Sequence, residues 1–557
     1  MKTKLHIVII VTLSLVCLML SRNVAASDWF VRPAGGDYGL EDGTSYENAW
    51  NGFANINWSV LGAGDTLYVV GTFTSANLEV KSGGNANADL KIRGDYFMGG
   101  GILSGRSLLW ADGDCHHITV TSITVNGGEI STKELFEHNV NSIEWVAPKY
   151  VRDHNKGFIS KGFQAGMMFR CVGTEYNNNK MFLIESVVNQ GSYEEITIDI
   201  INGDRPVNTE ATGYASMEVF WPISHITIDN CKVKAGQNRL VLVGTGGDNI
   251  TIRNCDIDGD DRDIGGGIYI SAAANYHRHQ NITIEGNYIH NIGSLGGTHN
   301  SDSHGIGVQG VDGLKITGNH IKEVACGIVF WHSSTPSRSI INWEVTYNYF
   351  EDMNGLRHID QFPGSGVAFS GADTGPNNSS GLVAYNIFDT SLNCPAGDSV
   401  YGNGIRTKWE KEVKIYNNVI NGYNYSILCN GAATVVNIKN NIIMNSGNYH
   451  ILRNGSVSED YNIFYPNKGE SKGPNSIIGD PLLNSDFTPK SNSPATDAGI
   501  DVGLTQDFQG NTVPQGLAPD IGAYEYISED KIRPGDTLPD KTELTCYNNV
   551  FNPAKGE

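Results

Sequence analysis

The 557-residue sequence lacks several features that would place it in the commonest protein classes. Beyond one apolar stretch near the N-terminus, no run is long and apolar enough to cross a membrane. No segment has apolar residues at helical spacing, which argues against alternating strand and helix units. Clusters of Lys and Arg are also missing and the net charge is −21, which argues against a nucleic-acid-binding protein.

The nine cysteines show neither the paired close spacing of a metal site nor the density of a disulfide framework. Several of them, including Cys231, Cys255 and Cys429, fall within strand-like segments. We expect mostly free buried thiols, with a Cys231–Cys255 disulfide as the alternative. Nucleotide-binding glycine loops, zinc motifs and serine-nucleophile motifs are missing as well, so no cofactor is predicted from a motif.

Residues 1–26 have the features of a secretory signal. Lys2 and Lys4 precede an apolar run from Ile7 to Leu20, and Val24-Ala25-Ala26 provides a small-residue cleavage site. We therefore expect a secreted or cell-surface protein that does not stay inserted in a membrane after cleavage. An uncleaved anchor is the alternative.

What the sequence does contain is one strand phrase repeated many times, for example ITIDNCKV, ITIEGNYI and VKIYNNVI. Apolar and β-branched residues alternate within each phrase, which predicts strands. Each copy carries an Asn or Cys before its last apolar residue, and the residues at this anchor position are Cys231, Cys255, Asn287, Asn319, Asn348, Asn386, Asn418, Asn441 and Asn462. This repetition predicts stacked coils, with the anchor side chains hydrogen-bonded along one internal ladder.

A second strand follows each anchor and usually opens with Gly. Examples are GIYIS at 267–271, GIGVQ at 305–309, GIVFW at 327–331, GVAFS at 366–370 and GIRTK at 404–408. Over roughly residues 28–526 this pattern resembles the right-handed parallel β-helix proteins of the pectate-lyase-like superfamily. The resemblance implies an all-β fold, a single-stranded right-handed parallel β-helix solenoid, and a secreted carbohydrate-active protein.

Breaks in the repeat divide the chain. Residues 27–128 are expected to form an N-terminal cap and the first coils, and residues 223–464 the main β-helix. Residues 129–222 lack the anchor but contain alternating strands, which predicts a small inserted β-barrel or sandwich that either binds substrate or shields one end of the solenoid. Residues 465–526 are expected to close the helix end. Residues 527–557 resemble a linker and the start of a C-terminal sorting or anchoring domain.

The Gly-led strands separate inward from outward side chains, because neighbours on a strand point to opposite faces. The expected outward residues include Tyr269, Gln309, Val329, Trp331, Ala368, Arg406 and Lys408. A short loop at 322–326 between long loops at 290–304 and 351–365 predicts a cleft. Its walls would carry Asp302, His304, Arg357, His358 and Asp360, with His332 at the far end of its floor.

These residues suggest chemistry on an acidic sugar polymer. His304 would be the general base, because His titrates nearest neutral pH, and Asp302 or Asp360 would orient it. The expected catalytic set is His304, Arg357, His358 and Arg406, in which the arginines hold a carboxylate. The expected substrate-binding set is Tyr269, Gln309, Asp302, Trp331, His332, Asp360 and Lys408. We predict a polysaccharide lyase that cleaves a uronate- or sulfate-bearing polymer by β-elimination.

Three other functions remain open. A glycoside hydrolase could use two carboxylates from among Asp302, Asp360, Asp373 and Glu410. A uronate C5-epimerase is the second alternative, because Asp302-Ser303-His304 resembles the Asp-x-His of alginate C5-epimerases, which share this fold. The third is a non-catalytic carbohydrate-binding adhesin. In purely structural interpretations, His304 satisfies a turn, while Arg406 and Lys408 are a solvated basic pair or partners for Glu410 and Glu412.

One acidic segment, DGDDRD at 258–263, is a candidate metal site. It places Asp258, Asp260, Asp261 and Asp263 within six residues, and oxygen-rich clusters suit Ca²⁺. The alternative is a solvated turn. We expect a monomer whose partner is its polysaccharide substrate.

Overall fold

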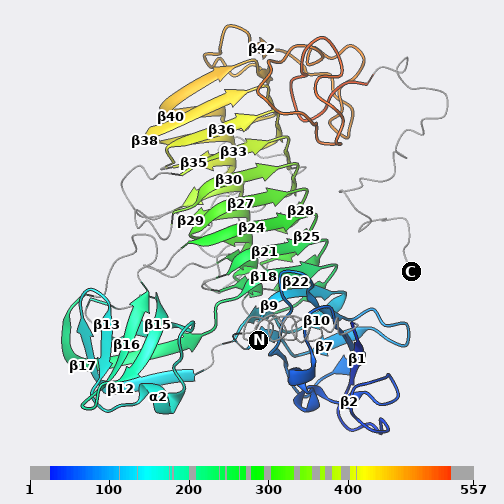
Figure 1. Cartoon of the computed structure of the whole chain (residues 1–557). Coiled ribbons are helices and arrows are strands. Elements are labelled where there is room, and N and C mark those ends of the chain that lie inside the picture. The colour runs from blue at the N-terminus through cyan, green and yellow to red at the C-terminus, as the bar shows by residue number, and fades with distance from the viewer. Residues whose placement is uncertain are drawn as a thin grey trace, which may run out of the picture.

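The computed structural model describes residues 26–527. Gaps in the description fall at 112, 114, 134–135, 175, 178–180, 200–207, 237–238, 245–246, 263, 271–277, 294–302, 332–338, 354–363, 371–378, 391–401 and 409. The chain forms a long parallel β-solenoid with a separate small barrel beside its N-terminal part (Figure 1). The predicted all-β solenoid with an inserted all-β module is thereby confirmed. The expected signal segment and the expected C-terminal sorting segment lie outside the described residues.

Each coil of the solenoid contributes three strands rather than the two that the sequence suggested. In one coil these are β24 (His279–Glu285), β25 (Tyr288–Ile292) and β26 (His304–Val308), which we call the first, second and third strands. First and third strands belong to one 23-stranded sheet, and second strands form a 13-stranded sheet. The second strand was not predicted because it begins at Tyr288, directly after the anchor Asn287. In the sequence it therefore looks like the end of the repeated phrase and not like a separate strand.

The strands of the solenoid follow this three-strand order throughout. First strands are β1 (Asp28–Arg32), β3 (Thr66–Val69), β6 (Leu90–Arg93), β9 (His116–Thr121), β18 (Ser224–Asp229), β21 (Asp248–Arg253), β24, β27 (Val311–Thr317), β30 (Ile341–Thr346), β33 (Ser380–Ala384) and β36 (Glu412–Tyr416). Second strands are β4 (Gly71–Phe73), β7 (Gly101–Ser104), β10 (Ile123–Asn126), β19 (Lys232–Lys234), β22 (Asp256–Arg262), β25, β28 (His320–Val324), β31 (Tyr349–Glu351), β34 (Ile387–Asp389), β37 (Val419–Asn421), β39 (Ile442–Met444), β41 (Ile463–Tyr465) and β42 (Ile477–Ile478). Third strands are β5 (Leu78–Val80), β8 (Leu108–Trp110), β11 (Ile130–Thr132), β20 (Arg239–Val243), β23 (Gly266–Ile270), β26, β29 (Cys326–Trp331), β32 (Ser365–Ser370) and β35 (Asn403–Thr407). The long strands β38 (Tyr425–Lys439) and β40 (Tyr449–Asp460) each join a third strand to the next first strand, and β2 (Trp50–Asn51) with the short 3-10 helices at Phe53–Asn55 and Trp58–Val60 complete the N-terminal cap.

Alternation along the strands puts one continuous apolar core inside the coils. Ile250, Ile282, Leu314 and Trp343 pair in register from β21 to β30, and all four are buried. Since successive strands are about 4.8 Å apart, such columns pack side chains directly on one another and exclude water.

The anchor residues form the internal ladder that the repeat predicts. The backbone N–H and the side-chain Nδ2 of Asn319 both donate to Oδ1 of Asn348, each at 2.9 Å. The same pair of bonds recurs at each Asn step from Asn287 to Asn462, so buried amide groups are satisfied coil by coil. Cys231 and Cys255 fill the slot in earlier coils as free thiols, so the alternative disulfide between them is wrong, and all six described cysteines are buried.

The residue before each anchor turns the chain between the first and second strands. Asn254, Gly286, Gly318 and Tyr347 all have φ between 54° and 63° there. Gly and Asn tolerate this left-handed conformation best, which explains the NC, GN and NN pairs of the repeated phrase. Tyr347 instead stacks on Tyr385, which holds the same position one coil later, with ring centroids 5.7 Å apart.

The insert is a closed antiparallel barrel of six strands in the order β12-β13-β16-β15-β14-β17. Its elements are β12 (Phe136–Val146), β13 (Tyr150–Asp153), α2 (Phe158–Lys161), β14 (Met168–Val172), β15 (Met181–Asn189), β16 (Glu194–Asp199) and β17 (Glu210–Phe220). It has its own core around Trp145 and Phe169. Trp221 joins barrel and solenoid, because Cβ atoms placed at Gly113 and at Gly166 would lie 2.9 Å and 3.3 Å from its ring.

A buried carboxylate makes the stability of the barrel depend on pH. Asp153 is fully buried and accepts hydrogen bonds from His138, Ser142 and the backbone N–H groups of Asn155 and Gly157. Burial by itself raises the pKa of Asp153, but these bonds outweigh it and lower the pKa from 3.8 to about 2.

Because the folded pKa lies below the unfolded one, we expect Asp153 to stabilise the barrel fully above pH 3.8. This contribution, about 2 kcal/mol, should be lost as the pH falls from 3.8 to about 2. Urea unfolding between pH 2 and 5 tests this by comparing the wild type with Asp153→Asn. The variant should be less stable at pH 5 and should show a shallower loss toward pH 2. Parallel pH profiles for the two proteins would contradict the assignment.

Two charged side chains end the core at the last coil. Arg453 and Glu459 occupy positions that Cys429 and Ile438 fill one coil earlier, and they pair at 3.4 Å. The backbone N–H of Gly473 also donates to Glu459, at 2.6 Å. The chain then packs back along the second-strand sheet through apolar residues between 477 and 524. In the part of the chain that the structure describes, no helix is long and apolar enough to span a membrane.

Candidate functional site

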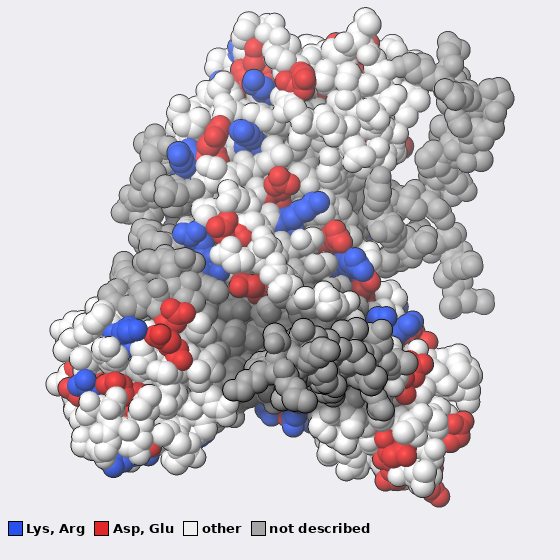
Figure 2. Space-filling view, viewed as in Figure 1, with Lys and Arg blue, Asp and Glu red and all other residues white. Residues whose placement is uncertain are grey.

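The outer face of the first strands carries mixed charges. Arg253 pairs with Asp229 at 3.0 Å and approaches Glu285 to 4.0 Å, so cations and carboxylates on neighbouring coils neutralise one another. Figure 2 shows Lys and Arg side chains interspersed with Asp and Glu over the solenoid. This face therefore offers no cluster of cations for an anionic polymer.

The outer face of the third strands instead gathers aromatic rings around His304. The His304 ring lies 4.8 Å from the Trp331 ring, and Trp331 makes an edge contact with Tyr269 at 5.3 Å. Gly307 permits this contact, since a Cβ there would lie 2.6 Å from the Trp331 ring and 2.8 Å from Tyr269. The structure thus brings together three of the predicted residues, His304, Tyr269 and Trp331.

Arg239 completes this aromatic cluster and was missed at the sequence level. Its guanidinium carbon lies 3.7 Å from the centre of the Tyr269 ring, a cation–π contact. The only available signal was its place on the strand before Tyr269, in a segment without the Gly-led pattern. The cluster therefore has a cation at one end and a nearly buried imidazole at the other.

A second group of charges lies three third strands further along, at Arg406, Lys408 and Glu410. Burial lowers the pKa of Arg406, and the nearby Cys326 thiol opposes this shift. Cys326 is the register partner of His304 on the neighbouring strand. Its electrostatic interaction with Arg406 therefore places Arg406 near the His304 end of these strands. Burial and the charge of Arg406 also lower the pKa of Lys408, against the opposing effect of Glu410.

Glu410 is the carboxylate of this group. Its side chain is fully buried and accepts the backbone N–H of Lys408 at 2.8 Å. The interpretation of Arg406 and Lys408 as a fully solvated pair does not hold for Arg406, whose side chain is half-buried on the outer face. Two cations and one carboxylate in a partly water-excluded setting interact more strongly than they would in water.

The expected groove floor is partly wrong. Val329 and Ala368 do point outward, but they are buried rather than exposed and form a small apolar cluster with Cys326 and Trp331. Alternation predicts the direction of a side chain but cannot predict what packs over it. Gln309 lies just past β26, where its backbone N–H donates to the Ile270 carbonyl at 2.9 Å.

The short connection predicted at 322–326 is shorter still, because β28 runs to Val324 and β29 begins at Cys326. Of the predicted wall residues, His304 is described and opens β26, whereas the other wall residues and the far end of the floor lie outside the described residues. The residues concerned are Asp302, His332, Arg357, His358, Asp360 and the alternative carboxylate Asp373.

The acidic segment at 258–263 is part of the second-strand face. Lys234 Nζ pairs with Asp258 at 2.9 Å and with Asp260 at 2.8 Å, and Arg262 approaches Asp260 to 3.4 Å. Asp261 belongs to the same strand end, whereas Asp263 lies outside the described residues. Among the side chains that the structure describes, no group of three or more metal-ligating residues is found. Calcium binding therefore stays a prediction.

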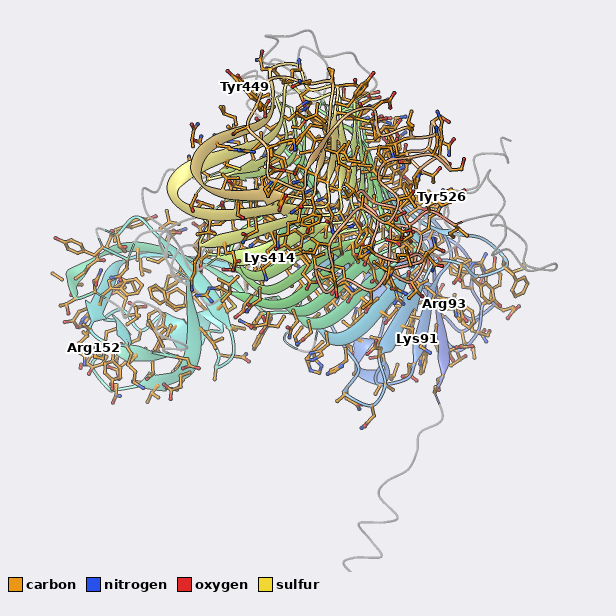
Figure 3. The ribbon with its side chains drawn as sticks, turned by 90° about the horizontal axis from the view of Figure 1, so that it is seen from above. Lys91, Arg93, Arg152, Lys414, Tyr449 and Tyr526 are labelled. Atoms are coloured by element: carbon orange, nitrogen blue, oxygen red, sulfur yellow. The ribbon has the colours of Figure 1, made fainter. Side chains whose placement is uncertain are left out.

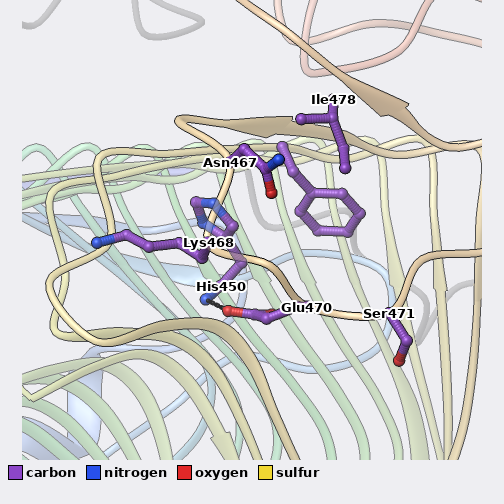
Figure 4. Close-up of a pocket in the computed structure, with 7 residues that line it drawn as sticks. His450, Asn467, Lys468, Glu470, Ser471 and Ile478 are labelled. Carbon is purple, nitrogen blue, oxygen red and sulfur yellow. Dashed lines mark hydrogen bonds between the residues drawn. The ribbon is translucent and has the colours of Figure 1, made fainter.

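A small surface pocket with an empty volume of about 230 Å³, open to solvent, lies at the C-terminal end of the solenoid (Figure 4). The Glu470 carboxylate accepts the backbone N–H groups of His450 and Ile451 at 2.7 Å and 3.1 Å. The His450 ring lies between Ser446 Oγ and the Pro466 carbonyl, each 2.7 Å away. These polar groups provide hydrogen-bond partners for exposed backbone groups of β40, the last long strand. Their role is therefore structural.

Comparison with known proteins agrees with the fold. The family model described as "Right handed beta helix region" matches residues 219–336, which identifies the handedness of the solenoid. No curated protein sequence matches the chain. Among solved structures, pectate lyase Pel9A is similar at 11% identity and a TM-score of 0.41, covering 90% of this chain and 97% of that one. An alginate lyase from Paenibacillus sp. is similar at 11% identity and a TM-score of 0.33, and the match covers 81% of this chain and 98% of that one. A lacto-N-biosidase from Eubacterium ramulus is similar at 13% identity and a TM-score of 0.39, and the match covers 83% of this chain and 68% of that one.

Proposed function

We propose that this protein is a secreted enzyme that cleaves an acidic polysaccharide by β-elimination on the outer face of its third strands. The observation that carries the proposal is the combination on one face of His304, an aromatic cluster and two partly buried cations. Aromatic rings suit the apolar faces of sugars, and cations suit uronate carboxylates. Secretion rests on the signal-like residues 1–26.

In the proposed reaction, His304 removes the proton on the sugar carbon next to the uronate carboxyl group. The electron pair left behind forms a carbon–carbon double bond as the glycosidic carbon–oxygen bond breaks, and the leaving oxygen takes up a proton. Negative charge develops on the carboxylate during this step. Arg406 and Lys408 would stabilise that charge, an effect strengthened by their partial burial.

Among the described residues of this face, the carboxylates favour elimination over hydrolysis. A hydrolase needs two carboxyl groups on either side of the bond, about 5–10 Å apart. Of Tyr269, His304, Gln309, Trp331, Arg406, Lys408 and Glu410, only Glu410 is a carboxylate. A hydrolase would have to recruit its second carboxylate from elsewhere, for which Asp302, Asp360 and Asp373 are the candidates.

The products of the reaction test the proposal. We expect the purified protein to release fragments with unsaturated uronate ends from at least one of pectate, alginate and chondroitin sulfate, and none from neutral xylan. Ultraviolet absorbance reports the unsaturated ends, and a reducing-sugar assay counts the cleaved bonds. Equal numbers of both support elimination. Reducing ends without unsaturation would indicate a hydrolase, uronate inversion without cleavage an epimerase, and binding without any reaction an adhesin.

A further inference from the structure

The barrel carries two exposed tyrosines on its outside, whereas several of its other aromatic rings lie in its core. Trp145, Phe158 and Phe169 are at most 1% exposed, whereas Tyr176 and Tyr214 are 54% and 49% exposed. A single exposed ring is ordinary on a protein surface, so the interest of these two lies in their being close together beside polar groups. The barrel enters the chain after β11, a third strand, and stands to one side of the solenoid, as Figure 3 shows around Arg152.

Both tyrosines belong to one small region of the barrel surface. A Cβ at Gly173 would lie 2.8 Å from the Tyr214 ring, so the ring packs directly against this loop. Three residues later the backbone N–H of Tyr176 donates to Glu210, on the same strand as Tyr214, at 2.8 Å. The backbone N–H and Nδ2 of Asn177 donate to the same carboxylate oxygen, at 2.7 Å and 2.6 Å.

The backbone aims Tyr214 away from the barrel. The pairing of β12 with β17 shifts register between Val140, opposite Ala215, and Ile143, opposite Gly213, and Tyr214 lies at this irregularity. Ala215, Met217 and Val219 on the same strand are buried in the barrel core, so alternation along β17 directs Tyr214 outward. The Tyr214 hydroxyl lies 3.1 Å from Asn139 Oδ1, which limits the rotation of the ring.

Polar groups with hydrogen-bonding capacity surround Tyr214. Asn139 and Ser216 pair across the two strands, and both hydrogen-bond to Glu137, which is exposed and stays ionised because these bonds lower its pKa. Carboxylates and amides beside an aromatic ring match the hydroxyl groups of a sugar. Glu137 and Glu210 would repel a uronate or a phosphate at this place, so the charge favours a neutral sugar.

We propose that Tyr176 and Tyr214 form a glycan-binding site for neutral pyranose units, separate from the third-strand face. The two rings stack on the apolar faces of the sugars, and Asn139 and Glu137 bind their hydroxyls. The barrel thereby holds a neutral glycan while the solenoid acts on acidic units. This site goes beyond the proposed cleavage and does not depend on it.

Affinity electrophoresis of the full chain tests the proposal. Gels contain a soluble xylan, a β-glucan, a galactomannan or polygalacturonate. We expect at least one neutral polymer to retard the wild type, with Tyr214→Ala and Tyr176→Ala each weakening the apparent affinity at least tenfold. Tyr214→Trp should retain binding, because it keeps an aromatic ring, and thereby separates lost stacking from lost folding.

Tyr465→Ala is the matched control, since Tyr465 is 37% exposed on the solenoid and should not affect retardation. Cleavage of short acidic oligosaccharides should be unchanged in both alanine variants, so a failure of the proposed enzyme activity would be seen separately. Lack of retardation by every neutral polymer would overturn the proposal. Retention of full affinity by Tyr214→Ala and Tyr176→Ala, or binding of polygalacturonate alone, would overturn it too.

Discussion

Replacing His304 with Ala is expected to reduce the rate of polysaccharide cleavage by about 10²–10⁴-fold, the usual contribution of a general base. The imidazole is 5% exposed, and its ring centre lies 4.8 Å from that of Trp331. Since the base acts in the chemical step, kcat should fall far more than KM changes. Initial rates of unsaturated product formation over a range of polymer concentrations measure both constants.

A loss of activity through misfolding must be separated from a loss of the base. The alanine leaves a gap beside Trp331, which should lower the free energy of unfolding by about 1–2 kcal/mol. His225→Ala is the matched control, because His225 is an exposed histidine on the first-strand face of the same solenoid and should retain full activity. If His304→Ala keeps more than a tenth of the wild-type kcat, His304 is not the base.

Replacing Asn386 with Ala is expected to lower the free energy of unfolding by about 3–5 kcal/mol, because several buried groups lose their partners at once. Its Nδ2 donates to the carbonyls of Val345 and Ala384 and to Asn418, at 2.8–3.1 Å. Its Oδ1 accepts the backbone N–H and the Nδ2 of Asn348, at 2.9 Å and 3.0 Å. Urea unfolding followed by far-ultraviolet circular dichroism measures the change.

Two further variants sharpen this experiment. Asn421→Ala removes two hydrogen bonds near the surface, from Asn421 Nδ2 to Asp389 at 2.7 Å and from Asn445 Nδ2 to Asn421 Oδ1 at 2.8 Å, and should change stability by less than about 1 kcal/mol. Asn386→Cys should lower the free energy of unfolding by an amount between those of Asn386→Ala and Asn421→Ala. Cys255 fills the same position in an earlier coil and directs its thiol toward backbone carbonyls. A stability change at Asn386→Ala no larger than at Asn421→Ala would contradict the role of the ladder.

The anchor ladder was predictable because its cause is local and repeated. A buried Asn between two apolar residues needs a partner, and the next copy of the phrase supplies it one coil away. The second strand of each coil was not predictable in this way. It is often only three residues long, as in β31 or β34. Its boundary is the left-handed residue before the anchor, which the sequence phrase does not separate from the strands around it.

The candidate site shows the same division. The outward directions of Tyr269, Trp331 and Arg406 followed from alternation, whereas His304 was expected in the loop before the strand and instead opens β26, with its ring beside Trp331. Burial did not follow, because Val329 and Ala368 also point outward yet are covered. The contact between Lys408 and Glu410 was only one of several possible interpretations, because neither spacing nor composition shows which charged residues lie close together.

By itself, the sequence determined the all-β solenoid, its inward and outward faces, the inserted module and the ladder of anchors. Each of these follows from a short-range rule, namely alternation of period two or the satisfaction of a buried amide, applied again in every coil. Only the tertiary structure decided the closure of the barrel, the contact of Arg239 with Tyr269, and the degree of burial around Arg406. These depend on residues distant in sequence, where packing and desolvation are set by neighbours that no local pattern names.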